Sequence, residues 1–174
     1  YIFPSNYLIS AISLAIGTLI KPQAAFILPA ILYMFFKNKK RFIDLLGYCI
    51  SGLLVFIAGF IPFNNTTNLF QFIATRLSVS ANQYPYGSVN AFSFWAIFGF
   101  WKPDNIAVWI GLGMSITIIV LITLIIYKKK IINGEYLIAA VSFFVTFMFL
   151  TRMHERHLLP VFAPLLLASS TNPI

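Results

Sequence analysis

Acidic residues are scarce in this chain: four Asp and Glu stand against twelve Lys and Arg, and only 9% of the 174 residues are charged. A water-soluble domain carries about 25% charged residues. With 60% hydrophobic residues, the chain also has more apolar surface than a soluble core of this size can bury. The shortage of charge therefore excludes an ordinary soluble domain and predicts an all-α membrane protein that crosses the bilayer several times.

Cysteine is almost absent as well. Cys49 is the single cysteine, so an intrachain disulfide is excluded within this sequence. An initiator methionine and a signal-peptide layout are also missing, and the sequence opens directly at Tyr1. We expect residues 1–174 to be part of one transmembrane domain that is cut at both ends.

The positive charge is concentrated in two short runs. Seven of the twelve Lys and Arg lie at residues 37–41 and 127–130, and both runs flank long apolar segments. Such clusters are typical of cytoplasmic loops under the positive-inside rule. A nucleic-acid-binding protein would need a basic face on a soluble fold, which this sequence does not provide. The predicted partner is therefore a membrane and not a nucleic acid.

Six apolar segments form the predicted helical bundle. A membrane-spanning helix needs about 20 residues, so the shorter segments must borrow flanking residues. With both basic runs on the inner side, the loop of residues 64–105 and the cluster at residues 151–157 fall on the outer side. The segments are residues 7–20, 24–36, 42–63, 106–127, 136–150 and 158–168.

The predicted outer loop contains two further apolar stretches. Residues 69–79 place their apolar side chains largely on one side, which favours a helix that lies in the membrane interface. Residues 89–101 are rich in aromatic side chains but too short to cross the bilayer. They predict a re-entrant or interfacial helix.

Five ionisable residues crowd into six positions after the fifth segment, from Arg152 to His157. If the helix continues to residue 156, Arg152 and Arg156 share one face at i and i+4, and Glu155 can brace Arg152. Clustered charges at a membrane boundary indicate function, and Arg suits phosphate groups. The alternative is that the arginines extend to lipid headgroups without a specific ligand.

Two other stretches are candidate binding elements. Lys21, Pro22 and Gln23 interrupt the first two apolar segments, where a helix N-terminus would favour an anion, although Pro22 is also simply a good helix start. Asn90 and Trp95 offer an amide and a flat ring of the kind that contacts sugars. The alternative for Trp95 is an aromatic belt at the membrane interface.

Taken in order, these three stretches resemble the GT-C superfamily of polytopic glycosyltransferases, in particular the bacterial and archaeal mannosyltransferase-like proteins related to PIG-V. The usual patterns there are K-P-Q, N-A-F-N-x-W and H-E-R-Y-L-L-P. This sequence departs from them at Ser93, where Asn is usual, and at His157, where Tyr is usual. The matching residues are Lys21, Pro22 and Gln23; Asn90, Ala91, Phe92 and Trp95; and His154, Glu155, Arg156, Leu158, Leu159 and Pro160.

The resemblance implies an enzyme in the plasma membrane of a prokaryote. It would move a hexose such as mannose from a polyprenyl-phosphate donor to a glycan, lipid or protein acceptor on the outer face. The acidic catalytic residue of the family is expected upstream of Tyr1, no metal ligand is assigned, and a divalent metal is left open as a cofactor. The implied donor-phosphate ligands are Lys21, Arg152, His154 and Arg156, and the implied supporting or sugar-binding residues are Gln23, Asn90, Trp95 and Glu155.

A function from another class stays open beside the enzyme. A transporter or flippase for an anionic lipid-linked substrate could use the same outer basic cluster as its entry site. Transporters tend to place charges near the middle of the bilayer on interrupted helices. The segments 42–63 and 106–127 hold almost no charge, which favours the enzyme.

Overall fold

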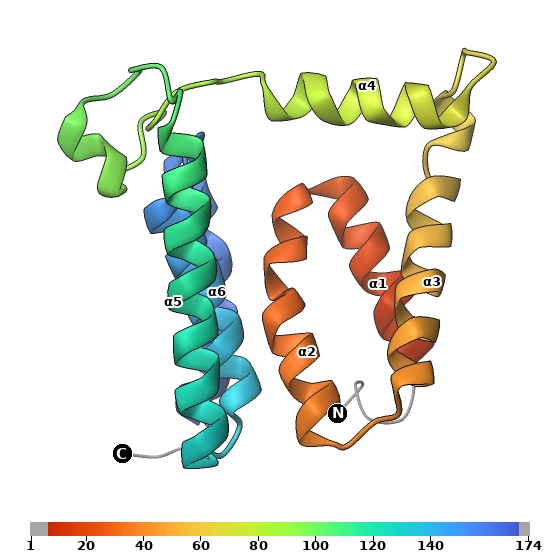
Figure 1. The fold of residues 1–174 in the computed structure, drawn as a ribbon, viewed down its shortest axis with the longest axis vertical. Coiled ribbons are helices and arrows are strands. Elements are labelled where there is room, and N and C mark those ends of the chain that lie inside the picture. The colour runs from red at the N-terminus through yellow and green to blue at the C-terminus, as the bar shows by residue number, and fades with distance from the viewer. Residues whose placement is uncertain (1–6, 171–174) are drawn as a thin grey trace. The chain divides into compact units, whose positions relative to one another are not determined.

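A computed structural model describes residues 7–170, and it is all-helical over that range (Figure 1). The predicted all-α class is thereby confirmed. The α-helices are α1 (Tyr7–Ile20), α2 (Leu28–Lys37), α3 (Phe42–Ala58), α4 (Leu69–Ala81), α5 (Ala107–Lys129), α6 (Gly134–Phe149) and α7 (Phe162–Ser170). Four short 3-10 helices connect them: η1 (Pro22–Ile27), η2 (Ile61–Phe63), η3 (Phe94–Phe98) and η4 (Glu155–Val161).

The chain divides into two compact units. Among the described residues, the first unit holds residues 7–25 and 35–83, and the second holds residues 26–34 and 84–170. Helix α2 therefore contributes to both. The stretch of residues 64–105, predicted as a single outer loop, is shared between the units: α4 belongs to the first, and the remainder from residue 84 belongs to the second.

In the first unit, α1 and α3 pack against each other in parallel. Tyr7 lies against Gly47 near the start of both helices, and Leu19 lies against Gly59 near their ends. Small residues at these points allow the two backbones to approach closely. Since the contacts advance in the same direction along both helices, Lys21 lies at the end of the pair where α3 finishes.

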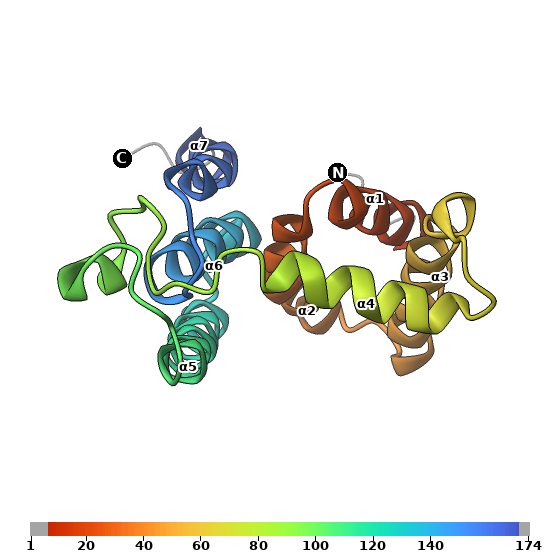
Figure 2. The same cartoon turned by 90° about the horizontal axis from the view of Figure 1, so that it is seen from above.

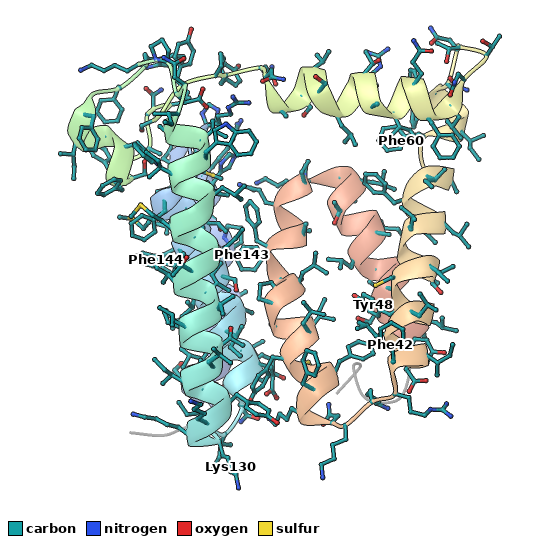
Figure 3. All side chains as sticks on the ribbon, in the orientation of Figure 1. Phe42, Tyr48, Phe60, Lys130, Phe143 and Phe144 are labelled. Carbon is teal, nitrogen blue, oxygen red and sulfur yellow. The ribbon has the colours of Figure 1, made fainter. Side chains whose placement is uncertain are left out.

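In the second unit, α6 is the central helix. It lies between α5 and α7 (Figure 2). Phe143 of α6 is buried against Ala140 and Val161, whereas its neighbour Phe144 is 47% exposed. Figure 3 shows their two rings on opposite sides of the helix. A second cluster around Ile138 and Ile126 joins α6 to α5 and to the first part of α2.

Two described helical segments are long and apolar enough to cross a membrane: Phe42–Phe63 and Ala107–Lys129. Their surfaces are apolar yet exposed, as at Trp109 (70% exposed) on α5. Such a surface is expected where lipid takes the place of water. The remaining apolar helical segments, Tyr7–Ile20, Pro22–Lys37 and Gly134–Phe149, are shorter, so six spans stay a prediction.

Two predicted helices differ from the structure. Residues 89–101 form only the short η3, because Gly99 and Trp101 adopt positive φ angles of 112° and 60° that no α-helix contains. Residues 24–36 are split between η1 and α2 instead of forming one continuous helix. The predicted interfacial helix at residues 69–79 is confirmed as helix by α4, whose Asn68 side chain caps the N–H of Gln71.

Candidate functional site

Two segments that are distant in the sequence meet at one end of the second unit. Residues 84–104 and residues 150–157 lie where α5 begins and α6 ends (Figure 1); we call them together the loop–turn site. Backbone hydrogen bonds join the segments: the N–H of Arg152 donates to the carbonyl of Tyr86 (2.9 Å), and the N–H of Val89 donates to Met153 (3.2 Å). The site is therefore a connected structure and not two independent loops.

Residues 84–104 are also held together by backbone hydrogen bonds within the segment. The N–H of Gly87 donates to the carbonyl of Lys102 (2.8 Å), and that of Trp101 donates to Ser88 (3.0 Å). Ser88 and Val89 are completely buried beneath these bonds. An irregular segment needs such partners near the bilayer, where unpaired backbone groups are costly.

A buried ion pair fastens the two segments through their side chains. Asp104 is 4% exposed. Its Oδ2 accepts hydrogen bonds from Nε of Arg152 (2.6 Å) and Oγ1 of Thr151 (3.0 Å), and its Oδ1 accepts one from Nη2 of Arg152 (3.3 Å). This two-pronged contact between guanidinium and carboxylate is among the strongest that proteins make.

Trp95 links the same loop to the end of α6. Its Nε1 donates to the carbonyl of Phe149 at 2.6 Å, which satisfies a carbonyl at the helix C-terminus. Gly111 of α5 leaves the room for this contact, because a Cβ there would collide with the Phe149 carbonyl and lie 3.3 Å from Nε1. The N–H of the indole that the sequence analysis offered to sugar is thus bonded to the protein backbone.

The shared face predicted for Arg152 and Arg156 is wrong. Helix α6 ends at Phe149, Leu150 is extended, and Arg152 has a φ of 65°, so no helical turn runs from residue 152 to residue 156. The physical cause is the set of partners from residues 84–104, which draw the chain out of the helix. Glu155 is exposed at the start of η4, and the carboxylate that holds Arg152 is instead Asp104.

The turn brings two imidazoles beside an aromatic ring. The ring centroid of His154 lies 5.1 Å from that of Tyr84 and 5.4 Å from that of His157. The backbone N–H of His154 donates to Nδ1 of His157 (3.2 Å), and the same Nδ1 lies 3.1 Å from Sδ of Met153. His154 is half-buried, and Arg156 is exposed on η4 in the same turn.

Asn90 is tied to a tryptophan that the sequence analysis had not selected. Nε1 of Trp101 donates to Oδ1 of Asn90 at 3.1 Å, and both residues adopt positive φ angles of 60° and 58°. The Trp101 ring lies 6.5 Å from that of Tyr84, which in turn contacts His154. Trp101 and Tyr84 thus connect Asn90 to the histidine turn.

The sequence analysis also missed Asp104 and Thr151. Asp104 is one of only four acidic residues in the chain, and it lies in the predicted outer loop among basic residues. That scarcity was the available signal, because a lone acid in such a loop needs a cationic partner. Nothing in the local spacing indicates that the partner is Arg152.

Lys21 and Gln23 belong to the first unit. Lys21 is exposed just after α1, and its N–H donates to the carbonyl of Gly17 (2.8 Å). Gln23 is buried in η1, where its Oε1 has no hydrogen-bond partner. Because these residues and the loop–turn site lie in separate units, their joint action on one phosphate stays a prediction.

The loop–turn site and the basic run at Lys128–Lys130 lie at opposite ends of α5. The helix has 23 residues between Ala107 and Lys129. At about 1.5 Å per residue it measures roughly 34 Å, which matches a hydrocarbon core of about 30 Å. Figure 3 shows Lys130 at the end of α5 away from the site.

Metal ligation has little support in this region. Among residues 7–170, no group of three or more His, Cys, Asp or Glu side chains is placed to hold a metal ion. The charged and imidazole side chains of the site are Arg152, Arg156, Lys102, His154 and His157, against the exposed Glu155 and the buried Asp104, whose carboxylate is already engaged by Arg152 and Thr151. This donor set suits an anion better than a cation.

Comparison of the chain with protein-family models, with curated protein sequences and with solved structures found no match. What the chain does is therefore inferred from its own residues and their geometry.

Proposed function

We propose that this chain is part of a membrane glycosyltransferase, similar to the GT-C enzymes, that transfers a hexose from a polyprenyl-phosphate donor on the outer face of the membrane. One observation carries the proposal. The loop–turn site gathers Arg156, His154 and exposed aromatic rings at the end of α5 opposite the Lys128–Lys130 run. A cationic and aromatic surface at the non-cytoplasmic boundary fits an anionic lipid headgroup that carries a sugar.

In this proposal the donor phosphate is held mainly by Arg156 and His154. As the bond between the sugar and the phosphate oxygen breaks, negative charge grows on the lipid phosphate that leaves. A guanidinium and an imidazole fixed beside it stabilise that charge, and His154 can supply a proton. Arg152 contributes less directly, because its Nε–Nη2 edge is committed to Asp104. The acid that activates the acceptor is still expected upstream of Tyr1.

The sugar of the donor would lie near Asn90. The Oδ1 of Asn90 accepts from Nε1 of Trp101, and Asn90 is exposed at the surface of the loop. Trp101 (46% exposed) and Tyr84 (38% exposed) offer flat faces for the C–H side of a pyranose. Trp101 therefore takes the role that the sequence analysis gave to Trp95.

The proposal includes a multi-pass topology with the site outside. To test it, Cys49 is replaced by alanine, and single cysteines are introduced for the exposed residues Glu155 and Lys129. A membrane-impermeant maleimide should label position 155 on intact cells. Position 129 should react only after the membrane is permeabilised. The reverse pattern would place the site in the cytosol and end the proposal.

The flippase alternative has less support. Residues 107–127 of α5 contain no charged side chain, whereas a transport path for an anion places charges within the spanning helices. The ionisable groups of the second unit lie at the ends of α5 and α6 instead, as expected for chemistry at a membrane surface.

The transfer reaction itself is tested in membranes that hold the protein in its native setting. The probe is mannosyl polyprenyl phosphate with radiolabelled mannose, and the readout is label that leaves the donor. Arg156→Ala should lower the transfer rate about a hundredfold, since it removes a donor to the leaving phosphate. Lys129→Ala removes the same charge from the basic run and should leave the rate unchanged. An Arg156→Ala protein that is present at equal levels and transfers at the parent rate would refute the assignment.

A further inference from the structure

We propose that Asp104 is a positioning residue for the phosphate site: through Arg152 and Thr151 it fixes the turn that carries His154 and Arg156. This inference rests on the proposed function for its ligand, but the geometry on which it depends belongs to the protein alone. Asp104 does not contact the donor in this proposal, and neither does the edge of Arg152 that it holds.

The first support is the contact itself. Both oxygens of the Asp104 carboxylate are engaged, by Arg152 at 2.6 and 3.3 Å and by Thr151 at 3.0 Å. The Asp104 side chain is 5% exposed and that of Arg152 is 28% exposed. A carboxylate enclosed in this way is poorly placed to act as a general base, because its lone pairs face donors of the protein.

The second support is the backbone of the turn. Arg152 has a φ of 65°, in the left-handed region that a residue with a long side chain seldom adopts. Such a conformation persists only where its surroundings hold it in place. Here Tyr86 holds the N–H of Arg152 and Asp104 holds its side chain. His154 and Arg156 follow two and four residues later, so their positions depend on that conformation.

The negative charge of Asp104 allows the positioning role to be separated from a direct electrostatic effect. A carboxylate beside an anion site repels the anion, so a purely electrostatic view predicts that removing Asp104 improves phosphate binding. The positioning role predicts the opposite, because the turn loses its fastening. Asp104→Asn therefore separates the two views by the direction of the change, and it keeps the size of the side chain and an oxygen that can accept from Thr151.

The first measurement follows the turn without any ligand. His154 and His157 are the two histidines of this sequence, so imidazole NMR signals of histidine-labelled protein in detergent report on the turn alone. Asp104→Asn should shift or broaden both signals. The matched control is Asp44→Asn, which makes the same chemical change in the exposed pair with Arg41 and should leave both signals in place. Unchanged signals in Asp104→Asn would overturn the inference.

The second measurement uses farnesyl phosphate, a short polyprenyl phosphate, as the probe. Asp104→Asn should weaken its binding about tenfold, and Asp44→Asn should not change it. In the Asp104→Asn background, Arg156→Ala should cost far less affinity than in the parent, since Arg156 is already displaced. Equal or tighter binding by Asp104→Asn would overturn the inference while leaving the proposed function in place.

Failure of the Asp104→Asn variant to fold and failure of the parent to bind farnesyl phosphate each lead to a definite conclusion. If Asp104→Asn fails to fold, Thr151→Val removes one of the two side chains that hold the Asp104 carboxylate and leaves the ion pair with Arg152 in place. The same shifts and loss of affinity are then required of it. If the parent protein binds no farnesyl phosphate, the proposed function fails, and the imidazole signals alone decide whether Asp104 positions the turn.

Discussion

The start of α3 and the loop–turn site each contain an arginine paired with an aspartate, but the two pairs are built differently. Nη2 of Arg41 lies 3.5 Å from Oδ1 of Asp44, three positions along the chain, and the Arg41 side chain is 80% exposed. Nε of Arg152 lies 2.6 Å from Oδ2 of Asp104, 48 positions away, and the Asp104 side chain is 5% exposed. Compared like for like, the arginine side chains are 80% and 28% exposed and the aspartate side chains 17% and 5%, so the first pair is local and more exposed, and the second joins distant segments and is more buried.

The difference shows what each pair contributes. Asp44 also accepts the N–H of Arg41 (3.1 Å), so that pair mainly caps the start of α3. The Asp104 pair instead joins the loop of residues 84–104 to the turn that follows α6. An arginine–aspartate pair thus caps a helix in the first unit, whereas in the second unit the more buried pair connects two segments that are distant in the sequence.

The largest effect should come from breaking the buried pair. Arg152→Ala leaves the Asp104 carboxylate enclosed without its partner and should cost about 3–5 kcal/mol of unfolding free energy. Arg41→Ala removes an exposed partner and should cost below about 0.5 kcal/mol. Unfolding of both variants in detergent measures the difference. Equal losses would mean that the two pairs do not differ as the structure indicates.

A smaller loss is expected from filling the space beneath the loop–turn site. The added methyl of Gly111→Ala collides with the Phe149 carbonyl, so α5 and α6 must separate, at a cost of about 1–3 kcal/mol. Gly113→Ala is the matched control, because a Cβ there meets nothing within 4 Å. If Gly113→Ala is as damaging as Gly111→Ala in the same unfolding measurement, the close approach is not what the site requires.

Trp95→Phe tests the hydrogen bond from the indole Nε1 of Trp95 to the Phe149 carbonyl. It keeps an aromatic ring but removes the donor to the Phe149 carbonyl, so we expect a loss of about 1 kcal/mol. Trp109→Phe, at a position 70% exposed on α5, should change the stability little. Sugar transfer by Trp95→Phe, corrected for the amount of folded protein, should stay near the parent rate. A specific loss of transfer would return Trp95 to the sugar site.

The smallest effect concerns the local pair alone. A double-mutant cycle on Arg41 and Asp44 should give a coupling free energy of at most about 0.5 kcal/mol. The same cycle on Arg152 and Asp104 should give several times that value. A coupling for the exposed pair that matches the buried one would remove the contrast between the two regions.

Much of the fold could be predicted from the sequence, because the polar and basic residues that interrupt the apolar runs mark the ends of several helices. The predicted segment at residues 7–20 coincides with α1, and that at residues 106–127 nearly coincides with α5. The predicted segment at residues 136–150 ends within one residue of α6, which stops at Phe149, but the path of residues 150–157 after that helix could not be predicted from local pattern. Residues 150–156 carry no helix-breaking residue, and the chain leaves the helix because partners at Tyr86 and Asp104 bind it.

The candidate site was predictable to a similar degree. The choice of residues 152–157 as a candidate site followed from charged residues clustered at neighbouring positions, which the sequence shows directly. The pairing of Arg152 with Asp104 and the hydrogen bond from Trp95 to the Phe149 carbonyl depend on contacts across 48 and 54 residues of sequence. Spacing along a helix cannot indicate such contacts once the helix itself has ended.

The central claim is that the loop–turn site binds the phosphate of a polyprenyl lipid. Photocrosslinking tests it most directly, with a farnesyl phosphate analogue that carries a diazirine beside the phosphate and with mass spectrometry of the crosslinked peptides. We predict crosslinks within residues 150–157 that unlabelled farnesyl phosphate competes away. Crosslinks confined to the run at Lys128–Lys130, with none in the turn, would contradict the claim.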